Sequence, residues 1–163
     1  MTIDEFWKLL EGLDPDGAAE ELTERLEELS PSEIEEFEAH FCRAFRQAYN
    51  RTLWSAAYLI DGGCSDDGFM DFRYGLISRG RRFYEAALKD PDSLAEMLTE
   101  EDFIPNEDFG YVASRVYEEK TGEPIPQPDL PPMGKPTGEK WNLQDPKLCA
   151  ERLPKIWKRY GNA

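Results

Sequence analysis

The residue types best suited to chemistry gather in one short stretch of the sequence, YLIDGGCSDDGF at residues 58–69. The stretch lies between two helical patterns. The first N–H groups of a helix are free and partly positive, so they can bind an anion or lower the pKa of a nearby thiol. Cys64 stands just before the second helix and is therefore a candidate nucleophile. The candidate acids and bases that accompany it are Asp66, Asp67 and Asp71.

A structural interpretation of the same stretch competes with the catalytic one. Gly62 and Gly63 can supply the positive φ angles of a helix–turn–helix corner, and Ser65 can cap the following helix. Nucleophilic catalysis needs a base, and His40 is the only histidine in the chain. The three cysteines are widely spaced, with no CxxC pair. We therefore expect reduced thiols, no metal site and no cofactor.

A small-ligand site at this corner is a related alternative. Arginine favours planar anionic partners such as carboxylate or phosphate, so a small anionic ligand is compatible with the sequence. The same arginines could equally pair with the many acids of the chain. The candidate ligand-binding residues are Trp54, Tyr58, Asp61, Ser65, Arg73 and Arg79.

Charge is unevenly distributed along the 163 residues, which carry 34 acids and 19 bases for a net charge of −15. Residues 1–40 have a net charge of −12, residues 41–90 of +2, residues 91–134 of −9 and residues 135–163 of +4. This balance argues against a nucleic-acid binder and against docking on anionic lipid. No apolar run approaches the length of a membrane span, and the acidic start is unlike a signal peptide, so we expect a cytoplasmic protein.

The acidic N-terminal region suggests a binding surface. Its blocks of charge could simply neutralise the basic blocks in the fold, or its exposed face could bind a basic protein partner. The predicted partner-binding residues are Glu20, Glu21, Glu24, Glu27, Glu28 and Glu35, with Glu36 and Glu38 on the same face. We expect a non-enzymatic interaction protein, immunity- or regulator-like. The alternative is an enzyme, or a protein that binds a small ligand or a metal ion, acting at the glycine corner.

The elements that must position these residues are helices. Thr2 with Glu5 and Ser30 with Glu33 have the spacing of capping boxes, and Asp14-Pro15 predicts the start of another helix. Apolar residues then recur at helical spacing, and no alternating run is long enough for a sheet. We predict one compact all-α domain of about seven or eight helices. Its parts are a helical core at residues 1–121, a Pro-rich extended segment at 122–144 and a helix at 145–163 that packs on the core.

One string in the chain is similar to a known bacterial family. The segment AAYLIDGGCSDDGFMDFRYGLISRGRRFYEAALKDPDSLA at residues 56–95 carries the likeness. Phe6-Trp7 and SPSEIEEFEAHF at residues 30–41 add to it. Together they resemble domain-of-unknown-function family 4240 over roughly residues 1–120. The resemblance implies a small helical domain of bacterial type, and it implies no reaction and no catalytic residues.

Overall fold

The computed structural model describes residues 1–161. These residues form an all-helical domain and contain no β-strand, only a single bridge between Asn50 and Thr137. The predicted fold class is confirmed, although ten α-helices exceed the predicted seven or eight. The elements are α1 (Ile3–Leu9), α2 (Ala18–Glu27), α3 (Pro31–Gln47), α4 (Arg51–Asp61), α5 (Asp66–Ser78), α6 (Arg81–Lys89), η1 (Pro91–Ser93), α7 (Leu94–Met97), η2 (Asp108–Tyr111), α8 (Val112–Thr121), α9 (Pro146–Arg152) and α10 (Pro154–Tyr160).

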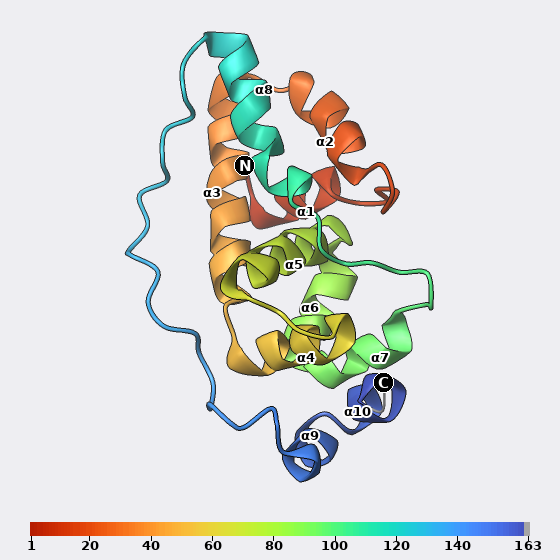
Figure 1. Ribbon diagram of the computed structural model, residues 1–163. Coiled ribbons are helices and arrows are strands. Elements are labelled where there is room, and N and C mark those ends of the chain that lie inside the picture. Colours follow the sequence, from red (N-terminus) through yellow and green to blue (C-terminus); the bar gives the residue numbers. More distant parts are fainter. Residues whose placement is uncertain (162–163) are drawn as a thin grey trace.

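The longest helix, α3, organises the domain. Figure 1 shows α1, α2 and α8 around its N-terminal half and α4 to α6 around its C-terminal end. α8 contacts both α2 and α3, so residues from the two acidic blocks lie side by side. Five phenylalanines are almost completely buried in the common core: Phe6, Phe37, Phe69, Phe72 and Phe109. Within residues 1–161, no helix is long and apolar enough to span a bilayer.

Neighbouring side chains cap the starts of five of the ten α-helices within residues 1–161. Thr2 and Ser30 each form the predicted capping box with the glutamate three residues later. The prediction for Pro15 was wrong, because α2 begins only at Ala18. The Asp14 side chain accepts a hydrogen bond from the backbone N–H of Asp16 at 3.0 Å, which stabilises a turn instead of a helix.

The Pro-rich residues 123–144, which we call the strap, run along the outside of α3 to α9 (Figure 1). Ile125 is buried, and the Arg46 guanidinium donates to the Pro131 carbonyl. Further along, the backbone N–H of Thr137 donates to the Tyr49 carbonyl at 2.9 Å. These contacts attach both halves of the strap to the core.

The last two helices also pack on the core. Asp92 is 6% exposed, and its carboxylate accepts hydrogen bonds from the backbone N–H groups of Lys155 and Ile156 at 3.1 and 2.9 Å. Those N–H groups belong to the first turn of α10, so Asp92 caps this helix from a distant part of the chain. Arg159 of α10 also binds the core, because its guanidinium donates to the carbonyls of Ala95 and Leu98 at 2.6 Å.

Candidate functional site

The glycine corner forms as the sequence predicts, and side-chain hydrogen bonds to its backbone help to hold it. Gly62 adopts a left-handed φ of 72° at the end of α4, and Ser65 caps α5 by accepting from the Gly68 N–H at 3.1 Å. The Trp54 indole donates to the Cys64 carbonyl at 2.9 Å. The candidate ligand residues Trp54 and Ser65 therefore stabilise the corner itself.

The Cys64 thiol lies in an environment that does not activate it. Burial raises the pKa of this thiol to about 11, and the nearby Asp61 adds to the increase. The only histidine, His40, shares a 2.8 Å hydrogen bond with the Met1 carbonyl and packs against Phe6. The nucleophilic interpretation thus has neither a lowered thiol pKa nor a histidine at the site to support it.

The candidate carboxylates of the corner lie in two kinds of environment, exposed and partly buried. Asp66 and Asp67 are exposed in the first turn of α5, where negative charge is favourable next to the helix N-terminus. Partial burial raises the pKa of the Asp61 carboxyl to about 6 and, together with Glu107 and Asp67, raises that of Asp71. Within residues 1–161, no cluster of three or more His, Cys, Asp or Glu side chains could hold a metal ion.

Arg73 is 1% exposed and has no acidic partner among the described residues. Its guanidinium carbon lies 3.8, 4.6 and 4.8 Å from the ring centroids of Phe45, Tyr49 and Phe69. Nη1 and Nε donate to the carbonyls of Phe45 and Phe69 at 3.1 and 3.3 Å. The hydrogen bonds and ring contacts of Arg73, a predicted ligand residue, are therefore made with the protein's own carbonyls and aromatic side chains.

The remaining predicted ligand residues lie apart from one another. Arg79 pairs with Asp102 at 3.0 Å, and Tyr58 accepts a hydrogen bond from the Gln144 amide at 3.3 Å. None of five prominent cavities within residues 1–161 is lined by Cys64, Asp66 or Asp67. The structure therefore does not gather the corner residues around one of these cavities.

The predicted acidic face divides into two groups. Glu20, Glu24 and Glu27 on α2 and Glu28 at its C-terminal end are exposed, and no cation of residues 1–161 pairs with them. Four others have partners within the chain. Glu21 approaches Arg25 at 3.9 Å, Glu35 accepts from the Tyr117 hydroxyl at 2.8 Å, Glu36 pairs with the Met1 ammonium, and Glu38 accepts from the Cys42 thiol at 3.5 Å. The expectation that all eight form one free face was wrong.

Three of the exposed glutamates line a groove between α2 and α8 of about 460 Å³, which we call the acidic groove. Its floor is apolar, with Ala19 and Val116 both buried. Arg115 is its only basic residue, and it forms no ion pair within the described chain. The polar and charged lining residues are Glu20, Thr23, Glu24, Glu27, Asp108, Arg115 and Glu119.

Sequence reasoning missed Asp108, Arg115 and Glu119. They belong to the second acidic block, residues 91–134, and its net charge of −9 was the available signal. That signal did not indicate which segment meets α2. The packing of α8 against α2 decides this, because it places five carboxylates around one groove.

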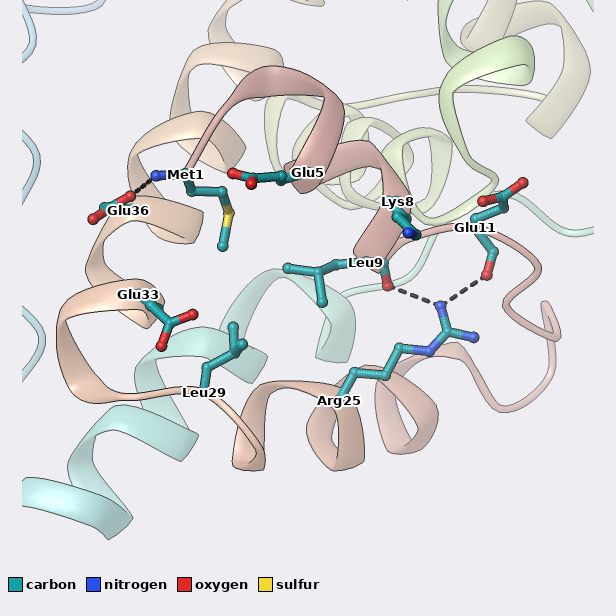
Figure 2. A pocket seen from close by; sticks show the side chains of 9 residues that line it. All are labelled: Met1, Glu5, Lys8, Leu9, Glu11, Arg25, Leu29, Glu33 and Glu36. Carbon is teal, nitrogen blue, oxygen red and sulfur yellow. Dashed lines mark hydrogen bonds and ion pairs between the residues drawn. The ribbon is translucent and has the colours of Figure 1, made fainter.

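A second groove, of about 770 Å³, lies between α1, α2 and α3 (Figure 2). Most of its charged groups interact within the chain. Arg25 donates to the carbonyls of Leu9 and Glu11 at 2.9 and 2.7 Å, which satisfies groups at the end of α1. Glu5 and Glu33 form the two capping boxes, and Glu36 pairs with the Met1 ammonium. This groove presents fewer free charges than the acidic groove.

A protein-family comparison matches residues 1–119 to "Protein of unknown function (DUF4240)". The chain belongs to the DUF4240 family. The match covers α1 to α7 and most of α8, and therefore both the glycine corner and the acidic groove. No curated protein and no solved structure matches this DUF4240 protein.

Proposed function

We propose that this DUF4240 protein is a non-enzymatic, cytoplasmic binding protein that engages a basic protein partner through the acidic groove. The observation that supports it best is the convergence of five carboxylates with a single arginine over an apolar floor. None of these carboxylates is paired with a cation of residues 1–161. An immunity- or regulator-like role is consistent with such a surface.

The chemistry of the groove suggests how a partner would be recognised. Exposed carboxylates attract Lys and Arg side chains over about one Debye length, roughly 8 Å at physiological salt, and so accelerate encounter. Ala19 and Val116 add an apolar contact to the floor between the charged rims. A basic helix or extended segment with alternating apolar and cationic side chains would match both features.

A charge-matched pair of variants tests the proposal. The groove variant combines Glu20→Gln, Glu24→Gln and Glu27→Gln. Its control carries the same charge change at three exposed carboxylates outside the groove, as Glu100→Gln, Glu101→Gln and Glu151→Gln. None of these three pairs with a cation of residues 1–161. Each is used with wild type as bait in a native lysate, and captured proteins are identified by mass spectrometry at low and high salt.

We expect wild type and control to capture the same basic protein and to release it at high salt. Each exposed charge contributes about 0.5 kcal/mol, so the groove variant should bind the purified partner about tenfold more weakly by calorimetry. Equal affinity of the groove variant and the control would contradict the proposal, as would capture that salt does not weaken.

A further inference from the structure

A smaller cavity of about 270 Å³ lies on the other side of α8 from the acidic groove, between α3, α5, η2 and the strap. It is lined by an acid, a thiol, aromatic rings and several polar groups from distant parts of the sequence. We call it the strap cavity. Its lining residues are Glu38, Phe41, Cys42, Phe45, Arg46, Tyr74, Gly110, Tyr111, Ser114, Gln127 and Met133.

Glu38 is the least satisfied charged group of the strap cavity. The side chain is half-buried, and no cation within residues 1–161 forms an ion pair with it. Its one hydrogen-bond partner is the weak thiol donor of Cys42, at 3.5 Å. Burial raises the pKa of the Glu38 carboxyl to about 7. A positively charged ligand would stabilise the ionised carboxylate at this position.

Aromatic rings form the walls beside Glu38. The Tyr74 ring stacks on Phe45 and Phe41 with centroids 4.8 and 5.9 Å apart, and Tyr111 meets it edge-on at 6.1 Å. Gly110 permits this packing, because a Cβ there would lie 2.5 Å from the Tyr74 ring. Phe41, Phe45 and Tyr74 stack on one another, and Arg73 covers Phe45, so the faces of these three rings are occupied. Tyr111 is half exposed and only meets Tyr74 edge-on, so its ring can still attract an organic cation.

Polar groups without a partner complete the cavity. The hydroxyls of Tyr74, Tyr111 and Ser114 and the Gln127 amide form no side-chain hydrogen bond with any described residue. They are therefore available to a ligand. A few such polar groups in a mostly aromatic site are typical of pockets that bind and orient small molecules.

The strap fixes the outer wall and the orientation of a ligand. Gln127 and Met133 of the strap line the cavity, and the guanidinium of Arg46 holds it by donating to the Pro131 carbonyl. Arg46 lies eight residues after Glu38 on α3, about 12 Å further along the helix axis. A cation would therefore be repelled from the Arg46 end and attracted to the Glu38 end.

We propose that the strap cavity binds a small organic ammonium compound, with the cationic group between the Glu38 carboxylate and the Tyr111 ring. This ligand chemistry is separate from the acidic groove, since none of the residues lining the groove lines the strap cavity. Failure of either proposal leaves the other unaffected.

Calorimetric titration with defined probes tests the inference. The probes are choline, putrescine and 2-phenylethylamine, and the neutral alcohol 2-phenylethanol controls for simple apolar binding. We expect at least one amine to bind with a dissociation constant near or below about 1 mM, and the alcohol to bind at least about tenfold more weakly.

Two variants locate the site. Glu38→Gln keeps the size of the side chain and should weaken amine binding at least about tenfold, while Glu118→Gln removes an exposed charge outside the cavity and should leave it unchanged. Circular dichroism establishes that both fold. Absence of saturable binding by all three amines, or equal affinity in wild type and Glu38→Gln, would overturn the proposal.

The pH dependence gives an independent measurement. Amine binding should strengthen between about pH 6 and pH 8 as Glu38 ionises. The titratable or charged groups that face it are Cys42 and Arg46 on α3, Tyr74 on α5 and Tyr111 on η2, and the strap and α8 contribute only uncharged groups. Burial raises the pKa of Cys42 and of Tyr74 to about 12 each, so neither titrates in this range. Binding that weakens with rising pH would contradict the role of Glu38.

Discussion

Replacing Glu38 by glutamine should stabilise the protein at neutral and alkaline pH and have little effect in acid. Burial raises the pKa of this carboxyl from 4.5 to about 7 in the folded state. The folded protein therefore binds the Glu38 proton more tightly than the unfolded chain does. The resulting stabilisation is complete below about pH 4.5 and is lost as the pH rises through about 7.

The size of the effect follows from the same shift. One pKa unit corresponds to about 1.4 kcal/mol, so the full shift would amount to about 3 kcal/mol. Water reaches this half-buried side chain and screens the charge, which reduces the expected difference to about 2 kcal/mol. Glutamine carries no charge at any pH, so the stability gain of the variant over wild type should grow by this amount between about pH 4.5 and pH 8.

Urea unfolding followed by the fluorescence of the four tryptophans measures the difference at both pH values. Asp61 and Asp71 also have raised pKa values, but they are present in both proteins and cancel in the comparison. Glu118→Gln, on the exposed surface of α8, should change stability by less than about 0.5 kcal/mol at either pH. A gain for Glu38→Gln that is the same at both pH values would refute the reasoning.

Other substitutions test the packing and the glycine corner. Arg73→Ala removes the guanidinium from its three rings and should lower the free energy of unfolding by about 3 kcal/mol in urea titrations. Gly75→Ala places a Cβ 1.5 Å from the Ile104 carbonyl oxygen and should cost about 3 kcal/mol, seen as a lowered thermal midpoint. Asp92→Ala leaves the first turn of α10 uncapped, so hydrogen exchange in residues 153–160 should accelerate. The Cys64 thiol should react with iodoacetamide near neutral pH about a hundredfold more slowly than free cysteine, followed by mass spectrometry; an equal or faster rate would revive the nucleophilic interpretation.

The helices that the sequence predicted best are those whose starts depend on neighbouring residues. Ser30-Pro31 with Glu33 predicted the start of α3 from interactions within one turn, and the structure confirms it. Asp14-Pro15 carried a similar signal for a helix start. Asp14 can also accept a hydrogen bond from the Asp16 N–H, and the structure contains this turn instead of a helix. Local patterns cannot decide between two local hydrogen bonds of similar strength, and tertiary packing makes the choice.

The strap cavity could not be predicted from the sequence, because it is formed by contacts between segments that are distant in the chain. Glu38 looks like one more surface glutamate of an acidic helix, and only the packing of Tyr74, Tyr111 and Gln127 around it reveals its burial. Arg73 misled in the opposite way, since the preference of arginine for planar anions suggested a ligand site. The aromatic rings that surround it come from α3, α5 and the α3–α4 turn, more than one of them distant in sequence.

The ion pairs show how much of the net negative charge is neutralised within the fold. Only seven acidic side chains pair with a cation within residues 1–161, out of 34 in the sequence. Neutralisation within the fold is therefore limited. Instead, the contact of α2 with α8 brings acids of two blocks into one groove. Two charges about 10 Å apart in water repel by about 0.4 kcal/mol, so five carboxylates cost roughly 4 kcal/mol without salt and about 1 kcal/mol with it.

The repulsion among the groove carboxylates provides a test of whether the groove is a binding surface. Neutralising Glu20, Glu24 and Glu27 removes most of it, so the groove variant should be slightly more stable than wild type, by up to about 1 kcal/mol at physiological salt. The same variant is expected to lose the partner. A loss of binding that accompanies a gain in stability cannot arise from misfolding. It would mean that the groove retains a destabilising arrangement of charge because a basic partner relieves it.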